Sequence, residues 1–192
     1  MNINDVIKAL KEYDGEEITL MEVCGTHTAS ISENAISSII SDKIHLISGP
    51  GCPVCVTVSD YVDKLIELAL EDNVIVTFGD MIRVPGREKA LKDIKADGAD
   101  IRMIYSPMET IELAKAEPYK NFVFAAVGFE TTTPIYALLL DEIIKQKIKN
   151  VQLLTALKTM PNVIATLCEA DNKIDGFIAP GHVAVITGSN AF

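Results

Sequence analysis

The chain has 192 residues, and 17 Lys and Arg against 27 Asp and Glu give it a formal net charge of −10. Hydrophobic residues make up 48% and charged residues 23% of the sequence, the balance of a globular protein rather than a disordered one. An acidic chain without a basic block argues against nucleic-acid binding. A polar N-terminus and the lack of any apolar run of about 18 residues argue against a signal peptide and a membrane span. We therefore expect a cytoplasmic protein with reduced cysteines.

Short apolar runs alternate with longer amphipathic stretches along the chain. The runs are nearly continuously apolar, as in parallel strands that are buried on both faces. Helices are expected after Ser59, after Ser106, where Pro107 and Glu109 complete a capping box, and from Pro134. This alternation predicts an α/β protein. The expected strands are residues 18–23, 44–48, 74–78, 101–105, 122–127, 151–157 and 176–179.

A domain boundary is expected near Glu117 and Pro118, after about four strand–helix units. It would give two small lobes of mostly parallel sheet flanked by helices, residues 1–117 and 118–192, with a cleft between them. The last residues have the pattern of a helix that is just beginning. We therefore expect the sequence to stop within the second lobe.

Unusual residues gather directly after five of the expected strands. In open α/β sheets, ligands bind at the carboxyl ends of the strands, where loops meet helix N-termini. Five such loops predict a functional site at that edge. The loops are CGTHT (24–28), GPGCPVC (49–55), GDMIRVPG (79–86), GFETTTP (128–134) and PGH (180–182).

The cysteines and His27 are the first candidates for chemistry. Cys24 lies at a strand-to-helix turn, where the helix N-terminus stabilises a thiolate, the form that binds metal or attacks. His27 could be a second ligand or a proton carrier. Cys52 and Cys55 have the spacing of a redox-active dithiol. An alternative is a structural metal site formed by these four residues, and a general thiol-disulfide oxidoreductase is another.

Other candidates carry weaker signals. Cys168 falls on an apolar position of a helical pattern, which predicts core packing. The threonine-rich loop after Gly128 offers hydroxyls and backbone N–H groups to an anion or polar ligand, and Glu130 within it could act as an acid or base or cap the helix. Arg83 and Arg87 could bind a carboxylate or form surface salt bridges.

Taken together, these loops resemble the HypD family of hydrogenase formation proteins, which takes part in the maturation of nickel–iron hydrogenase. The segments that carry the resemblance lie in the family's order over most of the chain. They are MEVCGTHT (21–28), GPGCPVC (49–55), FGDMIRVPG (78–86), GFETTTP (128–134) and APGHV (179–183).

The resemblance implies a scaffold on which iron receives carbon monoxide and two cyanide ligands, a maturation factor rather than a conventional turnover enzyme. It implies that Cys24 binds the iron together with a small HypC-type chaperone, and that a HypE-type partner donates the cyanide. Cys52 and Cys55 would be the redox-active dithiol that supplies electrons. His27 and Glu130 would take part in the chemistry. The expected ligand-handling residues are Thr26, Thr28, Thr131, Thr132 and His182.

The sequence departs from the family in one respect. The family continues for about as many residues again and ends in a domain whose four cysteines bind a 4Fe–4S cluster, whereas only Cys168 follows Cys55 here. The resemblance therefore implies no cluster on this chain. We expect a monomer that works within heterocomplexes.

Overall fold

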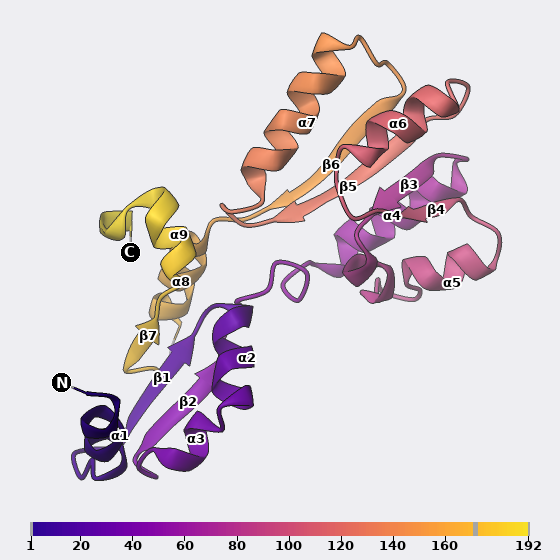
Figure 1. Ribbon diagram of the computed structural model, residues 1–192. Coiled ribbons are helices and arrows are strands. Elements are labelled where there is room, and N and C mark those ends of the chain that lie inside the picture. The colour runs from indigo at the N-terminus through magenta and orange to yellow at the C-terminus, as the bar shows by residue number, and fades with distance from the viewer. Residues whose placement is uncertain (1, 171–172, 192) are drawn as a thin grey trace. The chain divides into compact units, whose positions relative to one another are not determined.

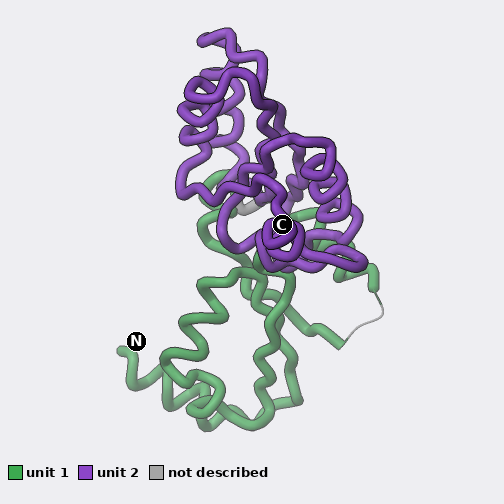
Figure 2. Tube along the Cα trace, turned by 90° about the vertical axis from the view of Figure 1, so that its right-hand side faces the viewer, with its two compact units in different colours: residues 1–52, 160–192 green, residues 53–159 purple. Residues whose placement is uncertain are grey.

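The computed structural model describes residues 2–170 and 173–191 and divides the chain into two compact units (Figure 2). Unit 1 comprises residues 1–52 and 160–192, and unit 2 comprises residues 53–159. The chain therefore passes between the units twice, after Cys52 and after Thr159. The expected boundary at residue 117 lies inside unit 2, because the strand that follows it pairs with a strand that precedes it.

Unit 1 is built on a parallel sheet with the strand order β2-β1-β7 (Figure 1). Its strands are β1 (Ile18–Glu22), β2 (Ile44–Ser48) and β7 (Gly176–Ile178). The central strand β1 pairs with β2 from Ile18↔Ile44 onward and with β7 from Leu20↔Gly176 onward. Its helices are α1 (Ile3–Lys11), α2 (Gly25–Glu33), α3 (Ile36–Ile39), α8 (Met160–Glu169) and α9 (Gly181–Thr187), and the short η2 (Ser189–Ala191) follows.

Unit 2 contains a second parallel sheet, with the order β4-β3-β5-β6. Its strands are β3 (Val74–Thr77), β4 (Ile101–Met103), β5 (Phe122–Gly128) and β6 (Val151–Leu157). Four helices and one 3-10 turn connect them: α4 (Ser59–Leu70), η1 (Gly79–Arg83), α5 (Leu91–Ala96), α6 (Glu109–Ala116) and α7 (Thr133–Lys145).

Helices cover both faces of the sheet of unit 2 (Figure 1). Side chains alternate across a strand, so odd and even positions of β5 belong to different cores. Val123 packs in the cluster that contains Leu65 of α4, whereas Phe124 packs in the cluster that contains Leu139 of α7. All seven residues of β5 are buried, which confirms the predicted two-sided burial for this strand.

Two-sided burial was wrong for the outer strands. The edge strand β6 consists of partly buried and exposed residues, with none fully buried, and three of the five residues of β2 are exposed. Both strands lie at the edge of their sheet, where a neighbouring strand is missing on one side. The predicted helix at Ser106 begins at Glu109, because the residues before it form tight turns, in which the N–H groups of Glu109 and Thr110 donate to carbonyls three residues back. The Glu109 carboxylate accepts a hydrogen bond from the backbone N–H of Ser106, as the predicted capping box requires. Among the described residues, no helix is both long enough and apolar enough to cross a membrane.

Candidate functional site

Cys24 lies where strand β1 passes into helix α2. It is the N-cap of this helix, with an extended backbone (φ −151°, ψ 126°), and it is buried, with 4% of its surface exposed. Its carbonyl accepts hydrogen bonds from the backbone N–H groups of His27 at 2.8 Å and Thr28 at 3.2 Å. The thiol therefore stands at the N-terminus of helix α2, the end of a helix that carries a partial positive charge. The predicted strand-to-helix turn is confirmed.

Two polar side chains flank the Cys24 sulfur. The Oγ1 atom of Thr26 lies 2.8 Å from Sγ, and the Nδ1 atom of His182 lies 3.8 Å from it. His182 belongs to helix α9, 158 residues further along the chain. The two loops meet because β7 pairs in parallel with β1, so that both strands end at the same edge of the sheet. A hydroxyl and an imidazole beside a thiol can accept its proton or hydrogen-bond to the thiolate.

Glu22, the last residue of β1, stabilises the Cys24 turn through hydrogen bonds of its carboxylate. Its side chain is 1% exposed. Oε2 accepts a hydrogen bond from the Cys24 backbone N–H at 3.0 Å, and Oε1 accepts one from the Thr28 hydroxyl. Thr28, which was expected to handle ligand, is thus engaged with Glu22. Glu22 was not among the predicted site residues, although a carboxylate at the end of an apolar strand, two residues before a cysteine, was a usable signal.

The loop after β2 packs directly onto the Cys24 turn. The backbone N–H of Gly49 donates to the Glu22 carbonyl at 2.8 Å. A Cβ atom on Gly51 would lie 2.4 Å from the Cys24 nitrogen and 2.6 Å from its Cα, so only glycine fits there. Cys52 follows Gly51 and is half-buried. The CGTHT, GPGC and PGH loops therefore come together at the carboxyl edge of the sheet of unit 1.

The remainder of the CPVC segment opens unit 2. Residues 53–56 form a turn, which Thr57 closes by donating its N–H to the Val54 carbonyl at 3.2 Å and its hydroxyl to the Pro53 carbonyl at 2.9 Å. Cys55 is exposed. The ammonium group of Lys158 donates to the Val56 carbonyl at 2.8 Å. Lys158 lies outside every motif that the sequence analysis identified.

The GFETTTP loop follows β5 in the same unit. Thr132 packs against Gly128, where a Cβ atom would come within 2.7 Å of the threonine side chain. Beneath the loop, the Tyr136 hydroxyl donates to the Val127 carbonyl at 2.8 Å, and burial raises the pKa of Tyr136 to about 12. Glu130 is half-buried and Thr131 is exposed. Both residues place polar side chains just before the start of helix α7. The motif loops thus form two groups, one on each sheet.

Three further residues were singled out in the sequence: Cys168, Arg87 and His27. Cys168 is exposed on α8, so its predicted packing in a core was wrong; of the residues of that helix, Met160 alone is buried. Arg87 forms ion pairs with Asp60 and Asp63, the salt-bridge alternative for this residue. Nδ1 of His27 is buried and has no hydrogen-bond partner within the described part of the chain.

A structural metal site gains no support from the geometry. Across residues 2–170 and 173–191, no group of three or more His, Cys, Asp or Glu side chains is arranged to hold a metal ion. The Cys24 thiol, with the Thr26 hydroxyl and the His182 imidazole beside its sulfur, offers donor groups of the kind that metals bind. A thiolate suits a soft or borderline metal.

Comparison with known proteins agrees with the motif pattern. The family model described as the hydrogenase formation hypA family, HypD, matches residues 1–192. The chain belongs to the HypD family. It is 43% identical over 177 residues to the hydrogenase maturation factor HypD of Rhodobacter capsulatus, which covers 91% of this chain and 47% of that protein. It is 40% identical over 177 residues to HypD of Escherichia coli, covering 91% of this chain and 48% of the relative. The chain thus spans about half the length of the curated relatives it matches.

Proposed function

We propose that this chain takes part in the maturation of nickel–iron hydrogenase, as a scaffold on which the Fe(CN)2CO group is assembled. The support is its membership in the HypD family together with the surroundings of Cys24. A buried thiol at a helix N-terminus, with Thr26 and His182 beside its sulfur, is suited to bind iron as a thiolate.

In this proposal, the residues around Cys24 have separate tasks. Cys24 binds the iron, and Thr26 hydrogen-bonds to its sulfur. His182 lies 3.8 Å from the same sulfur and takes up the thiol proton or contributes a nitrogen near the metal. Glu22 fixes the backbone of the turn and thereby the direction in which the thiolate points. His27 is proposed to act on the bound ligands, because its buried Nδ1 is not used by the described part of the fold.

Cys52 and Cys55 are proposed as the dithiol that supplies electrons. Oxidation of two thiols to one disulfide releases two electrons and two protons in one step. Gly51 packs on the backbone of Cys24, and Cys52 is the residue that follows it, so the first cysteine of the pair lies close to the Cys24 turn. Glu130, Thr131 and Thr132 are proposed to handle polar or anionic ligands at the N-terminus of helix α7.

The proposed partners follow from the same role. A HypC-type chaperone would share the iron with Cys24, and a HypE-type protein would donate cyanide. We place the work of this chain in the cytoplasm as a part of the same proposal.

Iron retention tests the scaffold role. The chain is purified without oxygen together with its HypC-type partner, and the iron content of the complex is measured. We expect Cys24→Ala to abolish iron retention while the melting temperature of the chain stays close to that of the parent. Cys168→Ala is the matched control, because Cys168 is an exposed thiol on α8. Equal iron in Cys24→Ala and the parent would refute the proposal.

A further inference from the structure

Lys158 joins two loops of unit 2 that carry candidate site residues. It directly follows strand β6, and its backbone N–H donates to the Gly128 carbonyl at 3.0 Å, where the GFETTTP loop begins. Its side chain turns to the other loop, and the ammonium group donates to the Val56 carbonyl at 2.8 Å. The residue is half-buried, and the hydrogen bonds of its backbone N–H and of its ammonium group fix the position of the charge.

The Val56 carbonyl belongs to the turn that presents Cys55. Thr57 closes this turn through the Pro53 and Val54 carbonyls, and Lys158 binds the next carbonyl in line. A cation is therefore held one residue beyond an exposed thiol. Cysteines of high reactivity are partly exposed and lie near a positive charge, because the charge stabilises the thiolate.

We propose that Lys158 is the positioning residue of the CPVC turn and makes Cys55, rather than Cys52, the attacking thiol of the pair. The inference rests on the proposed function, in which the two cysteines form a redox-active dithiol. Cys52 is half-buried and follows a glycine packed on the Cys24 backbone, whereas Cys55 is exposed and directly precedes Val56, whose carbonyl binds the ammonium group. In this proposal Cys55 is the accessible thiol of the pair and the one whose thiolate the ammonium group of Lys158 stabilises.

Oxidation of the two protein thiols needs a disulfide as the oxidant, and glutathione disulfide is used as the probe. The Cys55 thiolate attacks one glutathione sulfur, forms a mixed disulfide and releases one glutathione thiolate. Cys52 then attacks the Cys55 sulfur, the protein disulfide closes, and the second glutathione leaves with the proton of Cys52. Two protein thiols are oxidised, and one glutathione disulfide is reduced to two thiols.

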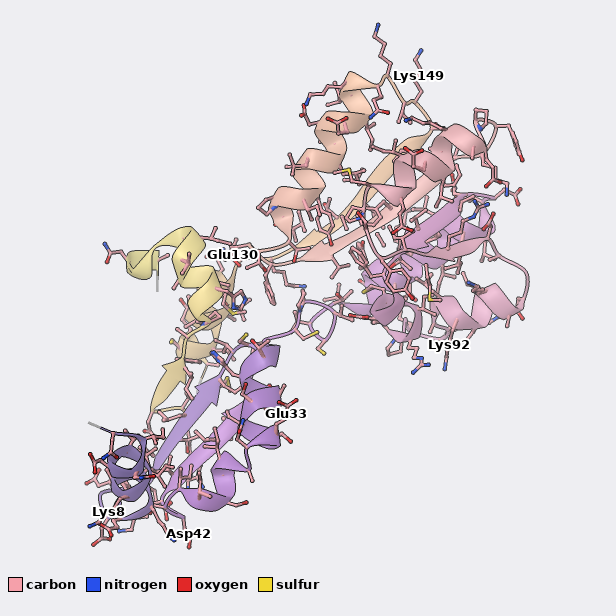
Figure 3. The ribbon with its side chains drawn as sticks, in the orientation of Figure 1. Lys8, Glu33, Asp42, Lys92, Glu130 and Lys149 are labelled. Carbon is pink, nitrogen blue, oxygen red and sulfur yellow. The ribbon has the colours of Figure 1, made fainter. Side chains whose placement is uncertain are left out.

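The test is the alkylation rate of each cysteine in the reduced full chain, measured with iodoacetamide between pH 6 and 10 and resolved by peptide mass spectrometry. Lys158→Met removes charge and donor, Lys158→Gln keeps a donor without the charge, and Lys158→Arg keeps both. Cys168 is the internal reference thiol, since it is exposed on α8. Lys149→Met is the matched control, because Lys149 lies at the end of unit 2 opposite to Glu130 (Figure 3).

We expect Cys55 to react faster than Cys52 at pH 7 in the parent chain. Lys158→Met and Lys158→Gln should slow Cys55 about threefold or more and raise the midpoint of its pH profile by about half a unit. Lys158→Arg, Lys149→Met and the Cys168 rate should stay within error of the parent. If the pH profile of Cys55 alkylation is unchanged in Lys158→Gln, the charge of Lys158 does not stabilise the Cys55 thiolate. If Cys52 is alkylated faster than Cys55 in the parent chain, Cys55 is not the attacking thiol.

A second measurement separates this inference from the proposed function. The Cys52→Ser variant should form a mixed disulfide with glutathione at Cys55, and Lys158→Met should slow that reaction in the same background. Failure of this reaction with iron retention at Cys24 intact would remove the inference about Cys55 and Lys158 and leave the scaffold role in place. Loss of iron binding in the parent complex would instead count against the scaffold role.

Discussion

Gly51 lies against the backbone of Cys24, so closely that a Cβ atom would come within 2.4 Å of the Cys24 nitrogen. The close approach of two backbones explains why a glycine stands between Pro50 and Cys52. It also means that the loop carrying Cys52 cannot move away from the Cys24 turn without losing a packed contact.

Gly51→Ala should therefore destabilise unit 1 and disturb the Cys24 site. Because the clash is with backbone rather than with a flexible side chain, we expect a loss of about 1–3 kcal/mol in the free energy of unfolding, together with reduced iron retention. Urea unfolding measures the first and metal analysis the second. Gly25→Ala is the control, since a Cβ atom at Gly25 would meet nothing within 4 Å. Equal effects of the two substitutions would show that the packing at Gly51 is not important.

Glu22→Gln should weaken the Cys24 turn. The buried carboxylate accepts from the Cys24 N–H and the Thr28 hydroxyl, and the amide nitrogen that replaces one oxygen cannot accept either bond. We expect a loss of about 1–3 kcal/mol in unfolding free energy and less iron bound at Cys24.

Glu33→Gln provides the comparison for Glu22→Gln. Glu33 is an exposed carboxylate at the end of helix α2, the helix that follows the Cys24 turn (Figure 3). The same charge change there should leave both unfolding and iron content unaffected. If Glu22→Gln behaves in the same way, the carboxylate does not hold the turn.

The stability of unit 2 should fall at acid pH. Hydrogen bonds from Arg102 hold the pKa values of Asp100 and Glu117 down to about 2, and Lys120 adds to both shifts. A carboxylate whose pKa is lowered in the folded state stabilises the fold above its ordinary pKa, 3.8 for Asp and 4.5 for Glu, and that stabilisation is lost as pH falls toward 2.

Glu117→Gln isolates this effect. We expect the variant to show a lower urea midpoint at pH 6 and a shallower decline of that midpoint between pH 4.5 and pH 2.5 than the parent. Tyrosine fluorescence follows unit 2 selectively, because four of the five tyrosines of the chain lie there: Tyr61, Tyr105, Tyr119 and Tyr136. A decline as steep as that of the parent would rule out the Arg102 cluster as its source.

Substrate range separates the scaffold from a general thiol-disulfide oxidoreductase. If the dithiol serves iron assembly, the reduced chain should reduce the disulfides of insulin little faster than free dithiothreitol does. The Cys55→Ser variant sets the baseline for the same assay. Rapid turnover of insulin that is lost in Cys55→Ser would favour the oxidoreductase instead.

Much of the fold could be predicted from the sequence, because strand positions are a local property. All seven expected strands are present within two residues of their predicted ends, and every pairing is parallel. The distribution of strands over two sheets could not be predicted, because it depends on long-range pairing. Strand β7 returns to β1 across more than 150 residues and brings His182 to Cys24.

The site was predicted less completely than the fold. The motif loops identified Cys24 and His182, and the structure brings both into contact range. Glu22 and Lys158 were missed because their side chains bind backbone groups of the site loops, and such contacts leave no pattern in the sequence. Cys168 was misplaced because an apolar spacing on a helix shows which residues share a face, but not whether anything covers that face.

An infrared spectrum tests the central claim most directly. The chain is co-purified anaerobically with its HypC-type partner from cells that mature hydrogenase, and spectra are recorded where metal-bound cyanide and carbon monoxide absorb and protein does not. We predict bands of both ligands in the parent and in Cys168→Ala, and none in Cys24→Ala. The same bands in Cys24→Ala as in the parent would contradict Cys24 as the iron ligand and with it the scaffold role.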